Sequence, residues 1–187
     1  TTEIYTLSLH DALPILRVAY LGGSITAANG WRPKTMAWFR QQYPGATFVE
    51  INPAISGTGS DYSGCRLQAD VLAQQPDLVF LECRVNGGGG YERQSVEGVV
   101  RQVWRQNPRT DICFVYTISQ GMLKDIQAGQ QTGFGTIMET IANRYGIPTI
   151  DLGVEIARRE QAGSLVFKAA EPVEGKLVFS KDGVHPG

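Results

Sequence analysis

The sequence predicts an α/β layer sandwich built on a mostly parallel sheet. Short apolar segments alternate with stretches of helical periodicity from residue 17 onward, a pattern typical of β-α-β units. Residues 77–83 form a nearly continuous apolar run, as expected for a central strand buried on both faces. The length of 187 residues fits one domain with a sizeable core.

The strands are predicted where short apolar runs lie between turn signals. We expect them at 17–21, 47–51, 77–83, 111–117 and 148–152. Two later apolar segments, 165–167 and 176–179, are expected to pair as a hairpin.

The helices are predicted from apolar residues at helical spacing and from their boundaries. Pro33 suits a first turn, Pro44 and Gly45 end the same helix, and Gly146 closes a later one. The expected helices are 33–43, 61–75, 95–106, 136–145 and 154–161.

Charge and hydropathy exclude two classes of protein. Seventeen basic residues balance eighteen acidic ones, so the sequence indicates no nucleic-acid partner. No apolar run approaches the roughly 20 residues that cross a bilayer.

The chain has three cysteines, an odd number, and no C-x-x-C motif: Cys65, Cys83 and Cys113. The last two lie in apolar runs, as buried free thiols do.

Residues 1–15 resemble the in-frame translation of a sequencing adapter. We expect them to be non-native and to make few contacts with the core, although an ordinary N-terminal strand is the alternative. They lack the basic n-region of a signal peptide. We therefore assign residues 16–187 to a single domain and leave His10 out of the search for a site.

Ser24 and His185 are the first candidates for chemistry. Ser24 follows an apolar strand and two glycines, which places it at the carboxyl edge of the sheet. Without His10, His185 is the one histidine left, and Asp182 precedes it by three residues. A serine, a histidine and an aspartate can supply a nucleophile, its base and the group that orients the base.

Gly57 and Asn86 are the candidate oxyanion donors, because they follow the second and third strands. A glycine N–H can approach a substrate closely, and an asparagine adds a donor on a fixed arm. Each residue also has a plainer reading: Ser24 as a helix cap, Gly57 as a turn glycine and Asn86 as a loop residue.

Along the chain the candidates follow in the order Ser24, Gly57, Asn86, Asp182 and His185. In that order, over residues 17–187, they resemble the motifs of the SGNH (GDSL-like) hydrolase family. The resemblance implies a flavodoxin-like three-layer sandwich that hydrolyses small-molecule esters, including short acyl groups on sugars, without metal or cofactor. It assigns Ser24 as nucleophile, His185 as base and Asp182 as its orienting carboxylate. Gly57, Asn86 and the Ser24 backbone N–H become the oxyanion donors.

The chain departs from the family pattern around these motifs. Gly23 stands where the family usually has Asp, and Arg84 and Gly87 flank Asn86 where it has a small residue and an Asp. We expect the missing Asp to loosen Asn86, so that Gly87→Asp raises kcat. Glu82 is unusual in an apolar strand, and we expect it to pair with Arg84 or another cation.

Family members continue beyond the position of His185, so we expect the domain to be truncated at its C-terminus. His185 is then expected to fray and the chain to lose activity.

Two other functions remain open. The departures around Asn86 fit a catalytically impaired SGNH-like binding module. Residues 22–26, Gly-Gly-Ser-Ile-Thr, also fit a phosphate loop of a flavodoxin-like nucleotide binder, but the chain lacks G-x-G-x-x-G and the accompanying lysine.

Overall fold

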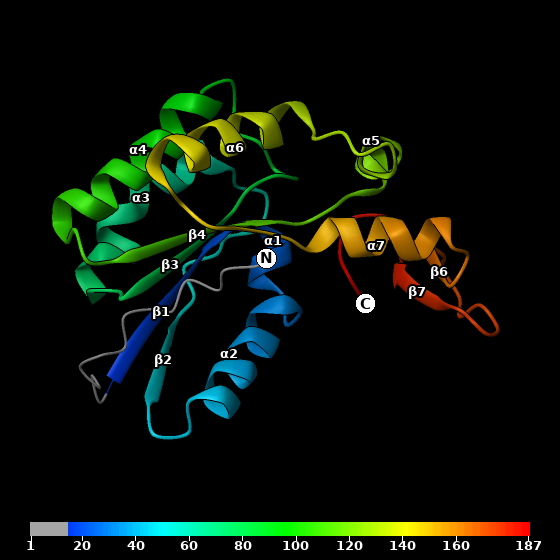
Figure 1. Ribbon diagram of the computed structural model, residues 1–187, viewed down its shortest axis with the longest axis horizontal. Helices are drawn as coiled ribbons and strands as arrows, with labels where there is room; N and C mark the ends of the chain where they lie inside the picture. The colour runs from blue at the N-terminus through cyan, green and yellow to red at the C-terminus, as the bar shows by residue number, and fades with distance from the viewer. Residues whose placement is uncertain (1–14) are drawn as a thin grey trace.

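The computed structural model describes residues 15–187, and its centre is a five-stranded parallel sheet (Figure 1). The strand order is β2-β1-β3-β4-β5, the flavodoxin-like order with a switch point between β1 and β3. The predicted α/β class and the strand positions are confirmed. The strands are β1 Ile15–Gly22, β2 Thr47–Ile51, β3 Leu78–Glu82, β4 Asp111–Tyr116 and β5 Thr149–Asp151.

The expectation for residues 1–15 falls, apart from Ile15 in β1, outside the described residues, and so does His10.

The predicted helices are present, and each begins a few residues earlier than expected. Two short helices, α1 Ser24–Ala27 and α5 Leu123–Gln127, were not predicted, nor was the 3₁₀ turn η2 Gln120–Met122. The remaining elements are α2 Trp31–Gln42, α3 Ser60–Asp70, the 3₁₀ turn η1 Leu72–Gln74, α4 Glu92–Gln106, α6 Gly133–Tyr145 and α7 Leu152–Gln161. None of the helices described here has the length and apolar character needed to cross a membrane.

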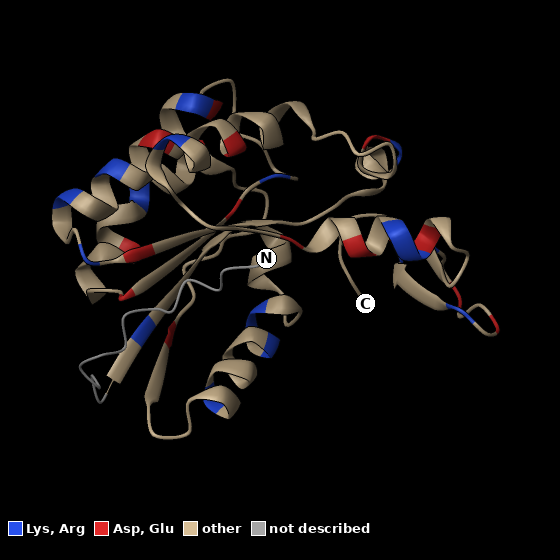
Figure 2. Ribbon diagram, viewed as in Figure 1, with Lys and Arg blue, Asp and Glu red and all other residues tan. Residues whose placement is uncertain are grey.

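Helices cover both faces of the sheet. On one face α3, α4 and α6 bury a large aliphatic core against β1, β3 and β4 (Figure 1). On the other face α2 packs aromatic and aliphatic side chains against β1, β2 and β3, with Tyr20 stacked on Phe80. Both α4 and α7 carry acidic and basic residues (Figure 2).

The last two strands, β6 Leu165–Lys168 and β7 Leu177–Ser180, run parallel, so the predicted hairpin is wrong. Leu165 is in register with Leu177, because the connecting residues 169–176 return the chain to the start of β6. A hairpin loop needs only about two to five residues. The longer connection reverses the direction of β7 relative to the expectation.

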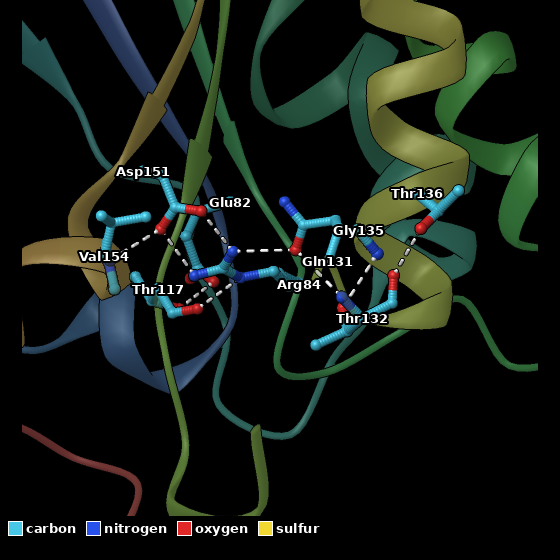
Figure 3. A network of polar contacts seen from close by, with 10 residues as sticks. Glu82, Arg84, Thr117, Gln131, Thr132, Gly135, Thr136, Asp151 and Val154 are labelled. Atoms are coloured by element: carbon cyan, nitrogen blue, oxygen red, sulfur yellow. Dashed lines mark hydrogen bonds and ion pairs between the residues drawn. The ribbon is translucent and has the colours of Figure 1, made fainter. Parts of the chain in front are cut away.

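An acidic and a basic side chain are buried at the end of β3. Glu82 accepts hydrogen bonds from the hydroxyls of Thr26, at 2.8 Å, and Thr117, at 2.7 Å. Arg84 instead forms a two-pronged ion pair with Asp151, at 2.6 and 2.8 Å (Figure 3). The expectation that Glu82 pairs with a cation was therefore wrong. Within the described chain its two carboxyl oxygens accept hydrogen bonds from two hydroxyls instead.

The Arg84 pair joins several elements at this edge of the sheet. The Nε of Arg84 donates to the carbonyl of Thr117 at 2.7 Å, and the Arg84 guanidinium lies 5.2 Å from the Tyr116 ring centroid. Asp151 also accepts the N–H groups of Gly153 and Val154 and so caps α7. Since Arg84 is only 1% exposed, its charge depends on these partners.

We predict that Asp151→Asn strongly destabilises the fold, because it leaves the Arg84 guanidinium buried without a counter-charge. The expected loss is about 3 kcal/mol of unfolding free energy, measured by urea denaturation. Glu155→Gln is the matched control, since it breaks exposed ion pairs with Arg158 and Arg159 and should change stability little. Equal losses in the two variants would contradict the importance of the buried pair.

Candidate active site

Ser24 lies where the chain leaves the sheet between β1 and β3. β1 ends at Gly22, Gly23 is extended at φ −90° and ψ −151°, and Ser24 is the first residue of α1. The first N–H groups of a helix have no partner inside it. Ser24 therefore presents a side-chain hydroxyl and a backbone donor at the same edge of the sheet.

The loop after β7 carries Asp182 and His185. Asp182 Oδ1 accepts the backbone N–H groups of Val184 and His185, both at 2.8 Å. It also accepts the Ser180 hydroxyl at 2.9 Å. These bonds fix the Asp182 carboxylate and turn its second oxygen, Oδ2, toward the imidazole.

The structure brings Ser24, Asp182 and His185 into one hydrogen-bonded row. Asp182 Oδ2 lies 2.6 Å from His185 Nδ1, and His185 Nε2 lies 2.7 Å from Ser24 Oγ. The bonds from the His185 ring, from the backbone of His185 and Val184, and from Ser180 hold the pKa of Asp182 well below its usual range. Asp182 therefore remains a carboxylate at neutral and mildly acidic pH.

The loop that carries His185 is fastened at several points. The Gln120 N–H donates to the carbonyl of Gly183 at 2.8 Å, and Ser180 forms an antiparallel bridge with Pro186. The Gly183 N–H in turn donates to the Ser180 hydroxyl at 2.9 Å. These bonds join the loop to Gln120 and to β7, while the expected fraying of His185 concerns motion and stays a prediction.

Asn86 and Gly57 lie in the loops that follow β3 and β2, the two neighbours of β1 in the sheet. The Asn86 carboxamide packs directly against Gly23, where a Cβ would come within 2.7 Å of Asn86 Cγ. Gly57 belongs to a turn whose first residue, Ile55, donates its N–H to the carbonyl oxygen of Gly22 at 3.1 Å. Gly57 has φ +75° and open space where a side chain would be. Both loops thus close onto the end of β1.

Sequence reasoning missed two supporting residues. Ser180 holds the Asp182 carboxylate, and its position two residues before Asp182 was an available signal. Gly23 has no room for a side chain beside Asn86, and this packing explains a glycine at that position. Only the contact between two loops reveals it.

Gly87 has φ +74°, a conformation that L side chains adopt with strain. Its carbonyl accepts the N–H of Ser60 at 2.9 Å, which ties the loop of Asn86 to the start of α3. The expectation that Gly87→Asp raises activity is therefore revised, because an aspartate would disturb the loop it was meant to steady.

Comparisons with known proteins give structural matches. No protein-family model matches the chain, and no curated protein does. A two-domain esterase active on acetylated mannans matches with a TM-score of 0.74 and 25% identity, over 92% of this chain and 44% of that one. The acetyl xylan esterase AlAXEase has a TM-score of 0.68 and 19% identity over 92% of each chain. A lipase/acylhydrolase from Enterococcus faecalis has a TM-score of 0.64 and 14% identity, over 91% of this chain and 87% of that one.

These matches confirm the fold that the motifs predict. Over about 92% of its length the chain resembles SGNH (GDSL-like) esterases and acylhydrolases in structure. It spans less than half the length of the two-domain esterase.

We predict that Gly23→Ala lowers any activity that depends on Asn86, because the new methyl group would push the carboxamide away. The loss of one oxyanion donor typically costs about 10²–10³ in kcat. Gly30→Ala is the control, because a Cβ at Gly30 meets nothing within 4 Å. Steady-state kinetics of both variants test the idea, and full activity in Gly23→Ala would refute it.

We predict that Gly87→Asp and Gly87→Ala both destabilise the protein, because position 87 requires a positive φ. The expected cost is about 1–2 kcal/mol in unfolding free energy, measured by thermal and urea denaturation. Gly98→Ala, at an open position within α4, is the control and should not destabilise. A more stable or more active Gly87→Asp protein would restore the original expectation.

Proposed function

We propose that this protein is a serine esterase that hydrolyses carboxylic esters through an acyl-enzyme. The observation that carries the proposal is the row of hydrogen bonds from Ser24 Oγ through the His185 ring to Asp182, at 2.7 and 2.6 Å. A serine in this arrangement can lose its proton as it attacks, and the imidazolium that forms is stabilised by the carboxylate.

In the first half of the reaction, Ser24 Oγ attacks the ester carbonyl while His185 Nε2 takes the hydroxyl proton. Asp182 accepts Nδ1–H and so keeps the lone pair of Nε2 directed at Ser24. His185 then gives the proton to the oxygen of the leaving alcohol, and the Ser24 ester remains. Water repeats the cycle in the second half, releasing the acid and restoring the Ser24 hydroxyl.

The negative charge on the carbonyl oxygen needs preset donors. The Ser24 N–H, the Gly57 N–H and the Asn86 side-chain amide are the donors in this proposal. The contact of Asn86 with Gly23 supports its part, since it places the amide beside the nucleophile. Asn86 Oδ1 is buried without a hydrogen-bond partner in the described structure, so the carboxamide owes its orientation to packing.

The substrates we propose are short acyl esters, above all acetyl groups, on sugars or other small polar alcohols. The similarity to the esterase active on acetylated mannans, at 25% identity, supports this class. The similarity to an acetyl xylan esterase agrees with it.

We predict that the protein reacts with a fluorophosphonate probe and hydrolyses 4-nitrophenyl acetate and acetylated manno- or xylo-oligosaccharides. Ser24→Ala should abolish labelling and lower kcat by about 10⁴-fold or more. Ser119→Ala, which removes a serine outside the hydrogen-bonded row, should keep both. Failure of the folded wild type to label or to hydrolyse any ester would favour the alternative, a binding module with the same fold.

A further inference from the structure

The helix that carries Ser24 is too short to fix its own position. α1 spans Ser24–Ala27 and is closed by two backbone bonds, from Ala27 to Gly23 at 2.9 Å and from Ala28 to Ser24 at 3.0 Å. Such a short helix gains little from its own hydrogen bonds. Contacts with the rest of the fold must therefore set the place of the nucleophile.

Thr26 supplies the side-chain hydrogen bond among those contacts and is completely buried, beside the buried Ile25. Its hydroxyl donates to Glu82 Oε2 at 2.8 Å, and its carbonyl accepts from Arg32 Nε at 3.1 Å. At 3.6 residues per turn, Ser24 and Thr26 point about 200° apart around the helix. The Ser24 side of α1 therefore faces His185 while the Thr26 side is held within the protein.

Both side chains that hold Thr26 have fixed positions of their own. Arg32 is 7% exposed and pairs with Glu50 on β2. Glu82 is the last residue of β3, is fully buried, and accepts a second hydroxyl from Thr117. Burial raises the pKa of Glu82, partly offset by the hydroxyls of Thr117 and Thr26 and by the nearby Arg84.

The end of β1 is shaped for the same contact. A Cβ at Gly22 would lie 2.6 Å from the Thr26 hydroxyl oxygen and 2.7 Å from the Glu82 carbonyl oxygen. Gly22 therefore lets Thr26 reach Glu82 across the end of β1.

We propose that Glu82 is a positioning residue for the nucleophile: through the Thr26 hydroxyl, its carboxylate sets where Ser24 lies relative to His185. The proposal rests on the proposed esterase function and deepens it, since Glu82 touches neither the substrate nor the reacting atoms. A displacement of about 1 Å at a reacting group can cost about 10²-fold in rate. Losing the Thr26 bond should therefore slow the chemistry and leave substrate binding almost unchanged.

The two hydroxyls on Glu82 provide a matched pair of variants. Thr26→Val and Thr117→Val each remove one hydroxyl from the same carboxylate, at sites 0% and 6% exposed, and keep nearly the same shape. They should cost similar stability, yet only Thr26 belongs to α1. Thr26→Ser keeps the hydroxyl and serves as the rescue variant.

The experiment measures melting temperature and steady-state hydrolysis of 4-nitrophenyl acetate for the wild type and the three variants. We expect Thr26→Val to lower kcat by about 10-fold or more with KM within about twofold. Thr117→Val leaves the bond between α1 and Glu82 in place, so it should lower kcat much less than Thr26→Val despite a similar drop in melting temperature. Thr26→Ser should recover most of the activity. Equal kcat losses in both valine variants, or none in Thr26→Val, would overturn the proposal.

A second measurement does not depend on activity. The chain has two histidines, so the ¹⁵N resonances of the His185 ring can be assigned by comparison with a His10→Gln variant. We expect Thr26→Val to shift the His185 Nε2 resonance, as its partner Ser24 Oγ moves, and Thr117→Val to shift it much less. An unchanged resonance in Thr26→Val overturns the positioning role, whereas an inactive wild type with the expected shifts overturns only the esterase function.

Discussion

Two buried side chains on either side of Cys83, Glu82 and Arg84, hold the carboxyl edge of the sheet together. Glu82 binds a hydroxyl from α1, after β1, and one from the segment after β4, while Arg84 binds the carboxylate that begins α7. A buried charge without partners costs several kcal/mol, so each of these segments has one favourable position. The loops that carry the candidate site start from that fixed edge.

Much of the fold could be predicted from the sequence, because long elements carry their own pattern. The apolar run 77–83 became β3, and apolar residues at helical spacing located the long helices. A strand's apolar pattern does not encode its direction, so the pairing of β6 with β7 was predicted wrongly. α1 was missed since four residues are too few to show a period.

The candidate site, too, could be predicted only in part from the sequence. Two glycines before Ser24, and the three-residue spacing of Asp182 and His185, were the signals in the sequence. The structure places these three side chains within hydrogen-bond distance of one another. Gly57 and Asn86 lie in neighbouring loops, and their roles remain predictions. Contacts such as that of Thr26 with Glu82 join residues 56 positions apart, so a sequence read segment by segment offers no signal for them.

The proposed base and the proposed nucleophile belong to different parts of the fold. Ser24 follows the central sheet, while His185 follows the two-stranded sheet of β6 and β7. Leu165 and Phe167 of that small sheet pack in a separate, smaller apolar cluster with Ile118 and Ala157. Small clusters open at lower free energy than large cores, since proteins unfold in cooperative units of unequal stability. On gentle heating the His185 ring should separate from Ser24 while the central sheet stays folded, so loss of the proposed activity should precede global melting and reverse on cooling.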